Sequence, residues 1–217
     1  MSKKLNTNSN LYIIIYAALM VVIVAFLLAF VSKALQSRSE ANVKIDKMSQ
    51  ILAALNIRDL DKADVEAKYA EVVKDEAKTD DLTYYTCSVD GQTKYVVPVK
   101  GMGLWGGIWG YVAVNDDGNT IYGAYFSHES ETAGLGALIN ELPFQQQFQG
   151  KQIYDAQGDV ALSVVKIGKK IDGLQPENRC DALTGATLTS DGVDQMLKSS
   201  LSKYQHILNG NSGAAQD

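Results

Sequence analysis

Residues 11–31 read LYIIIYAALMVVIVAFLLAFV, an apolar run without a single charged side chain. As an α-helix that rises about 1.5 Å per residue, this run spans a hydrocarbon core of about 30 Å. A cleaved signal peptide is the alternative, but its apolar region is usually only about 7 to 15 residues long and precedes a small-x-small site. No clear site of that kind follows residue 31. The sequence therefore predicts one retained membrane helix.

The charges that flank this segment leave its orientation open. Lys3 and Lys4 precede the segment, whereas Lys33 and Arg38 follow it. Because positive charge lies on both sides, the positive-inside rule favours neither orientation.

Helical patterns continue after the apolar segment. Apolar side chains recur at helical spacing over residues 45–55, and residues 61–77 are rich in strong helix formers. The spaced apolar residues are Ile45, Met48, Ile51, Leu52 and Leu55. We expect a short cytoplasmic N-terminus over residues 1–10 and a helical connector over residues 32–80.

From residue 82 onward, the residue pattern predicts strands and turns. Residues 82–89 and 94–99 are rich in Tyr, Thr and Val, and the Asp90-Gly91 pair between them favours a hairpin turn. Residues 107–114 and 120–126 flank NDDGN in the same way. NDDGN lacks the alternating acidic ligands and the distal Glu of an EF-hand, so we expect a turn there and no metal site.

Two further elements complete the fold that we expect. Residues 160–167 are a strand candidate, and residues 191–208 predict a helix with one apolar face and Gly210 as its stop. The chain is thus expected to form an α+β fold with a mainly antiparallel sheet and flanking helices over residues 81–209. Residues 210–217 are expected to be a flexible tail.

Composition argues against several classes of function. The net charge is −5 without clusters of Lys and Arg, so a nucleic-acid partner is not expected. Cys87 and Cys180 match no metal-ligand spacing, and either a disulfide or two free thiols is compatible with the sequence. His128 and His206 form no catalytic set with a nucleophile, so no catalytic residues and no hydrolase chemistry are expected. Trp109 and the tyrosines are expected in the core.

The segment DALTGATLTS, residues 181–190, lies directly before the last predicted helix. N–H groups at the start of a helix favour a phosphate, and Gly185 and Ala186 allow close approach. The alternative is that Ser190 or Thr189 caps the helix and that no ligand binds.

DALTGAT resembles the flavinylation signature, in which Asp and two variable residues precede Ser or Thr, Gly, Ala, and a final Ser or Thr. The resemblance implies that a Mg²⁺-dependent flavin transferase uses FAD to place FMN on Thr187 through a phosphoester bond. Thr184 occupies the interior hydroxyl position.

The chain also resembles the C subunits of the bacterial Na⁺-translocating NADH:quinone reductases over most of its length. The matching motifs are KMSQILAALNI, GLWG at residues 103–106, ETAGLG at residues 131–136, and DALTGATLTSDGV. Ala133 stands where this family usually has Pro, which loosens that turn but removes no functional group. The main rival is the homologous G subunit of the Rnf ferredoxin:NAD⁺ complex, but GLWG and TLTSDGV favour the sodium pump.

The resemblance also implies which residues surround the flavin. The pocket for the flavin ring is expected to be lined by Leu104, Trp105, Glu131, Thr132 and Leu135. Thr184, Gly185, Ala186, Leu188 and Thr189 are expected around the attachment residue, Thr187. Lys166 is a candidate to neutralise the phosphate or the reduced flavin. The alternatives are that Leu104 and Trp105 are ordinary core residues and that Lys166 is a solvated strand residue.

The function implied by the resemblance is electron transfer by an FMN-carrying, single-pass subunit of a larger respiratory complex. Its domain is expected on the periplasmic side of the inner membrane, with lipid, the other subunits and the flavin transferase as partners. NADH oxidation, the quinone site and the sodium path are expected in other subunits, because this sequence has no GxGxxG signature and no charge within its membrane helix. An anchored binding module without a redox role is the second hypothesis.

Overall fold

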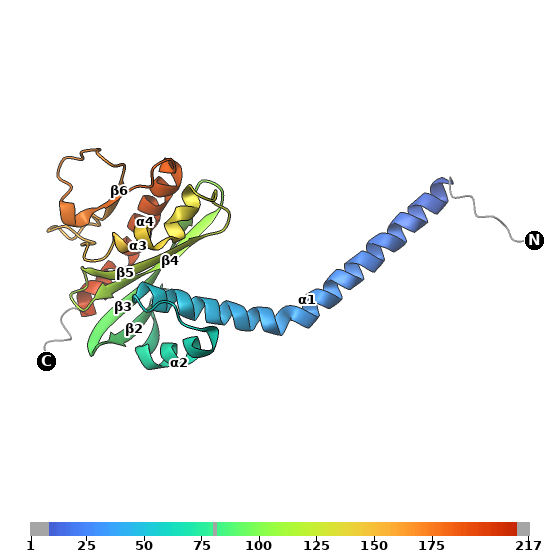
Figure 1. Cartoon of the computed structure of the whole chain (residues 1–217), viewed down its shortest axis with the longest axis horizontal. Helices are drawn as coiled ribbons and strands as arrows, with labels where there is room; N and C mark the ends of the chain where they lie inside the picture. The colour runs from blue at the N-terminus through green and yellow to red at the C-terminus, as the bar shows by residue number, and fades with distance from the viewer. Residues whose placement is uncertain (1–8, 80–81, 212–217) are drawn as a thin grey trace, which may run out of the picture. The chain divides into compact units, whose positions relative to one another are not determined.

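The computed structural model describes residues 9–79 and 82–211 (Figure 1). The chain divides into two units, residues 1–44 and residues 45–217. Helix α1 (Asn10–Ala54) runs through this boundary, so residues 45–54 belong to the second unit. Residues 1–8 of the expected N-terminus and residues 212–217 of the expected tail lie outside the described part of the chain.

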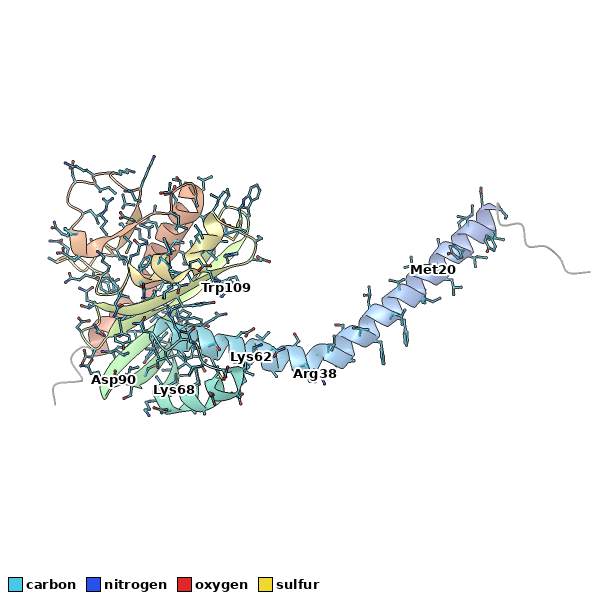
Figure 2. The ribbon with its side chains drawn as sticks, viewed as in Figure 1. Met20, Arg38, Lys62, Lys68, Asp90 and Trp109 are labelled. Atoms are coloured by element: carbon cyan, nitrogen blue, oxygen red, sulfur yellow. The ribbon has the colours of Figure 1, made fainter. Side chains whose placement is uncertain are left out.

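In the first unit, α1 is long and apolar enough to cross a membrane. The expected span, residues 11–31, lies within it with mostly exposed side chains, such as that of Met20 (Figure 2). The helix does not break after residue 31. Lys33 Nζ donates to Gln36 Oε1 at 3.0 Å, and Gln36 Nε2 donates to Glu40 Oε1 at 2.8 Å. The predicted membrane helix is therefore the apolar part of a longer helix.

The second unit is built on a five-stranded sheet in which each strand pairs antiparallel with the next along the chain. The strands are β1 (Val73–Thr79), β2 (Leu82–Val89), β3 (Gln92–Met102), β4 (Gly107–Asn115) and β5 (Ile121–His128). The predicted α+β class with a mainly antiparallel sheet is confirmed.

The two predicted hairpin turns are present. Asp90 and Gly91 have φ values of 51° and 77°, the left-handed pair that a two-residue hairpin turn requires. Figure 2 labels Asp90 at the tip of this hairpin. In the second turn, Asp117 Oδ1 accepts hydrogen bonds from the N–H groups of Asn119 and Thr120 at 2.9 and 2.8 Å. The Asp117 carboxylate thus stabilises the turn itself.

The helix predicted over residues 61–77 is wrong beyond Val72. Helix α2 (Lys62–Val72) ends there, and the next residues form edge strand β1. Their helix propensity is overridden by pairing with β2, where Glu76 lies opposite Tyr85 and accepts a hydrogen bond from its hydroxyl at 3.3 Å. The Lys, Asp and Glu side chains of β1 also protect this edge from pairing with other chains.

Side chains alternate between the two faces of the sheet and build two cores. Val97 and Val99 of β3 belong to one core, whereas Val96 belongs to the other. The first core includes the apolar face of helix α4 (Thr187–Asn211), and the second includes buried residues from the end of α1 and from α2. Figure 1 shows α2 and α4 on opposite sides of the sheet. The helical spacing seen over residues 45–55 therefore marks a core-facing stripe, in which Ile51, Leu52 and Leu55 are fully buried.

Shorter elements connect β5 to α4. They are η1 (Gly136–Asn140), α3 (Leu142–Gln146), β6 (Ser163–Val165), η2 (Pro176–Asn178) and β7 (Arg179–Asp181). Strands β6 and β7 pair parallel to each other. The strand predicted over residues 160–167 is thus reduced to its central residues. Because Val165 lies opposite Asp181, this pair fixes the start of the DALTGAT segment.

Helix α4 begins at Thr187, earlier than the predicted residue 191, and it extends to Asn211, so the predicted stop at Gly210 is wrong. It packs closely on β3: a Cβ atom added at Gly101 would lie 2.7 Å from Met196 Cβ, and one added at Gly192 would overlap the carbonyl oxygen of Met102. These contacts hold the first turns of α4 against the end of β3.

Cys87 and Cys180 are both free and buried. They belong to the two different cores, on opposite faces of the sheet. Burial raises the pKa of each thiol to about 12. Of the two possibilities that the sequence left open, the structure has two unpaired thiols.

Candidate functional site

Three segments that are distant in sequence meet at one end of the sheet. They are the β3–β4 loop, residues 103–106; the segment after β5, residues 131–136; and the first turn of α4. Glu131 joins them: its Oε1 accepts from the Trp105 N–H at 2.8 Å, and its Oε2 accepts from the Thr189 hydroxyl at 2.5 Å. The structure thus brings together the GLWG, ETAGLG and DALTGATLTS motifs.

The backbone of Trp105 is held on both sides. Its N–H donates to Glu131, and its carbonyl oxygen accepts from Ser130 Oγ at 3.1 Å. The Gly103 N–H donates to the Gly106 carbonyl at 2.8 Å and closes the loop. The Trp105 side chain is nevertheless 67% exposed. A large aromatic ring is therefore presented to the outside on a fixed backbone.

Other apolar side chains near these motifs are also exposed. Leu104 is 46% exposed, Leu135 is 43% exposed and Leu188 is 60% exposed. We call Leu104, Trp105, Leu135 and Leu188 the apolar wall. The alternative that Leu104 and Trp105 are core residues is wrong. Because burying a large apolar side chain is favourable by about 1.5 to 3 kcal/mol, exposed side chains of this size favour a binding partner.

Glu131 itself is buried, with 7% of its surface exposed. Burial raises the pKa of its carboxyl group, but the hydrogen bonds from Thr189 and from the N–H groups of Trp105 and Gly106 outweigh that effect. His128 adds to the same direction, and its Nδ1 accepts the Glu131 N–H at 3.2 Å. The pKa of Glu131 is therefore below its ordinary value, and the group is a carboxylate at neutral pH.

The capping alternative is wrong for both hydroxyl residues that suggested it. The Thr189 hydroxyl donates to Glu131, and Ser190 Oγ donates to the Ala186 carbonyl and accepts from the Leu183 N–H, both at 3.0 Å. The first helical turn closes through the Ser190 N–H and the Ala186 carbonyl at 3.0 Å, so Ala186 is the N-cap residue. Alanine has no side-chain oxygen for the first N–H groups of α4.

Thr187 is the first residue of α4 and is exposed, as are Thr184 and Gly185. Gly185 has a φ of 80°, which lets the chain turn sharply into the helix. A Cβ atom added at Gly185 would lie 3.2 Å from Leu135 Cδ2, so the turn lies beside the apolar wall. Ala186 and Thr189 are buried, so neither presents its side chain at the surface.

Two residues predicted for the flavin site, Thr132 and Lys166, lie at the edge of the three segments that meet. The Thr132 side chain is exposed, and the Thr132 carbonyl accepts from the N–H groups of Leu135 and Ala137, both at 3.1 Å. Lys166 is exposed at the end of β6, where the neighbouring Val165 carbonyl accepts from the Ala182 N–H at 2.9 Å. That bond brings the backbone of Lys166 next to the DALTGAT segment.

Sequence reasoning missed Ser130, which holds the Trp105 carbonyl. No local pattern marks Ser130, because it acts through a contact made in the folded chain. Sequence reasoning placed Ala186 near the attachment residue but did not show that it begins the helix without a side-chain cap. Among the described residues, no three His, Cys, Asp or Glu side chains gather in a way that would hold a metal ion.

A cavity of about 570 Å³ lies elsewhere, between the last turns of α1 and β5. Arg58 and Tyr125 line it, and it contains none of the residues predicted for the flavin site. The predicted site is therefore an exposed wall beside a helix start, distinct from this cavity.

An exposed apolar wall beside an uncapped helix N-terminus suits a ligand that has a flat ring and a phosphate. Residues 103–202 match the family model of the FMN-binding domain, so the chain contains a domain of this class. A crystal structure of the C subunit of the Na(+)-translocating NADH-quinone reductase from Parabacteroides distasonis is 38% identical, with a TM-score of 0.74 over 80% of this chain and 96% of that chain. The chain belongs to this family of C subunits, the NqrC proteins, which confirms the resemblance found in the motifs.

Other relatives support the same family assignment. The crystal structure of Shewanella oneidensis NqrC is 25% identical, with a TM-score of 0.67 over 79% of this chain and 99% of that one. The C subunit from Haemophilus ducreyi is 43% identical over 143 residues, which are 64% of this chain and 49% of that protein. The C subunit from Pseudomonas aeruginosa is 38% identical over 116 residues, which are 53% of this chain and 44% of that protein. The chain spans about half the length of these curated relatives. Its apolar N-terminal helix fits a single-pass inner-membrane protein.

Proposed function

We propose that this chain carries one FMN, joined through its phosphate to the Thr187 hydroxyl, and relays electrons within a Na⁺-translocating NADH:quinone reductase. Membership of the NqrC family supports the assignment to this complex. The observation that carries the proposal is the position of Thr187: an exposed hydroxyl at the start of a long helix, beside an exposed apolar wall.

The helix start fits the phosphate end of FMN. Ala186 offers no side-chain acceptor, so the first N–H groups of α4 remain available to phosphate oxygens. The positive end of the helix dipole favours the same negative charge. Lys166 is proposed to add a positive charge from the end of β6.

The apolar wall fits the ring end. We propose that Trp105, Leu104, Leu135 and Leu188 cover the flavin ring and exclude water from it, with Thr132 at its margin. Bound FMN supplies the reversible uptake and release of electrons. The chain's own residues position the ring and set its surroundings, and none of them needs to form a bond to a substrate.

The attachment step is proposed to need a Mg²⁺-dependent flavin transferase with FAD as co-substrate. The Thr187 oxygen forms a bond to the FMN phosphorus, the pyrophosphate bond of FAD breaks, AMP leaves, and the hydroxyl proton passes to base. The exposure of Thr184, Gly185 and Thr187 leaves this turn open to another enzyme.

The apolar part of α1 is proposed to anchor the chain in membrane lipid, with the FMN-binding domain on the periplasmic side. Other subunits of the complex would supply and accept the electrons. They would also hold the NADH site, the quinone site and the sodium path.

The test is to purify the full chain from cells with and without the flavin transferase, and to record its absorbance before and after denaturation and acid precipitation. We expect a yellow protein that keeps its flavin absorbance, and only in cells that contain the transferase. A colourless protein from cells that contain the transferase would contradict the proposal and favour the anchored binding module.

A further inference from the structure

We infer that Glu131 and Thr189 are positioning residues, which fix the distance between the attachment hydroxyl and the apolar wall, rather than ligands of the flavin. This inference rests on the proposed function. It changes the role that the family resemblance implied for both residues, and it follows from where their polar atoms point.

Both side chains are directed into the protein. Thr189 is 2% exposed, and its hydroxyl donates to Glu131 Oε2 at 2.5 Å. The other carboxylate oxygen of Glu131 accepts from the Trp105 N–H at 2.8 Å. With both oxygens engaged by the protein, the Glu131 carboxylate is already satisfied without a ligand.

The space around the carboxylate is closed as well. A Cβ atom added at Gly103 would lie 2.5 Å from Glu131 Oε1, and one added at Gly136 would lie 2.5 Å from both Glu131 Oε2 and Thr189 Oγ1. Glycine at these two positions lets the GLWG loop and the ETAGLG segment close around Glu131. A flavin cannot replace these neighbours without opening both segments.

The bonds of Glu131 connect the two parts of the site that the flavin must span. Thr189 lies in the same helical turn as Thr187, and Trp105 carries the largest side chain of the apolar wall. A carboxylate that accepts one bond from each segment acts as a fixed spacer between them. Without the Thr189 bond, Glu131 loses one of its two anchors, and the Trp105 loop is held less firmly.

The test measures amide hydrogen exchange in the full-length chain in detergent, with Thr189→Val, which removes the hydroxyl, and Thr189→Ser, which retains one. A Thr187→Ala background gives the exchange rates without flavin. We expect the Trp105 amide to exchange about tenfold faster or more in Thr189→Val, since a charge-assisted hydrogen bond that supports it is lost, and to recover in Thr189→Ser. Amides in the centre of β3, such as that of Val97, should be unchanged. Ser202→Ala, an exposed hydroxyl on the same helix, is the control.

The second readout uses flavin-loaded protein. Thr189→Val should keep its covalent FMN, seen as fluorescence on a denaturing gel, while the native protein shows brighter flavin emission because the ring leaves the Trp105 indole. The inference is overturned if Trp105 exchange is unchanged in a folded Thr189→Val protein, or if the change appears only when flavin is present, as expected of a direct ligand. Wild-type protein that never acquires flavin would instead refute the proposed function, and the exchange result in Thr187→Ala would still stand.

Discussion

Replacing Glu131 by Gln tests how strongly its carboxylate holds the three motifs together. In the wild-type chain, one oxygen accepts from the Trp105 N–H at 2.8 Å and the other from the Thr189 hydroxyl at 2.5 Å. Glutamine keeps the shape but has a single acceptor oxygen, so one of the two donors faces an NH₂ group. Since a hydrogen bond to a charged group contributes about 1.5 to 3 kcal/mol, we expect the free energy of unfolding to fall by about that amount at pH 7.

The loss should depend on pH in a defined direction. The folded-state pKa of Glu131 is lowered, while the unfolded value is near its ordinary 4.5. A carboxyl group whose pKa is lowered on folding stabilises the protein above the unfolded-state pKa, and this stabilisation is lost as the pH falls through the folded value. The difference between wild type and Glu131→Gln should therefore be largest near neutral pH and shrink below about pH 4.5.

The assay is urea unfolding of the detergent-solubilised full chain at several pH values between 7 and 4, followed by circular dichroism. Glu129→Gln is the matched control, because this exposed carboxylate of the same loop accepts only a 3.3 Å bond from the Gly107 N–H. Its effect should stay within about 0.5 kcal/mol. A Glu131→Gln protein as stable as wild type at pH 7, or a loss that persists unchanged at pH 4, would refute the reasoning.

Three further predictions address the core, the wall and the topology. Leu52→Ala removes a fully buried side chain from the end of α1 and should lower the free energy of unfolding by about 2 to 5 kcal/mol. Val43→Ala, at an exposed position of the same helix, should leave the free energy of unfolding nearly unchanged. Urea unfolding measures both variants. Trp105→Ala should leave FMN attached but expose its ring to water, seen as altered absorbance and brighter emission. Unchanged spectra and unchanged electron transfer would show that Trp105 does not contact the flavin. Protease added to intact spheroplasts should digest the part of the chain after Lys33, and full protection would refute the periplasmic side.

Local signals were sufficient for much of the fold. The apolar run at residues 11–31, the Asp90-Gly91 turn and the apolar face of the last helix each depend on neighbours within a few residues, and each is present in the structure. Strand β1 was missed because its residues favour a helix, and only pairing with β2 makes them a strand. The sequence contains no local sign of that pairing.

The site was predictable in its location but not in its detail. The motifs marked the three segments that meet, and the exposure of Trp105 and Leu188 is compatible with a ligand surface. The start of α4 was placed too late because Thr189 and Ser190 resemble capping residues. Their hydroxyls are used in contacts with residues 131 and 183 instead, which depend on the folded chain. Similarly, a Glu in a loop is usually exposed, and only the closure of three distant segments buries Glu131.

Covalent attachment at Thr187 is the central claim, and a phosphoester requires a side-chain hydroxyl. Cells that contain the flavin transferase should produce wild-type chain that fluoresces on a denaturing gel, and its Asp181-to-Lys198 peptide should carry the mass of FMN on Thr187. Thr187→Ala should fold and reach the membrane without flavin, because Thr187 is exposed and is not the N-cap, so its loss changes the free energy of unfolding by only about 0.5 kcal/mol. Thr187→Ser, which keeps a hydroxyl, should retain the attachment. Fluorescence that persists in Thr187→Ala, or an FMN mass on Thr184 or Thr189, would contradict the account.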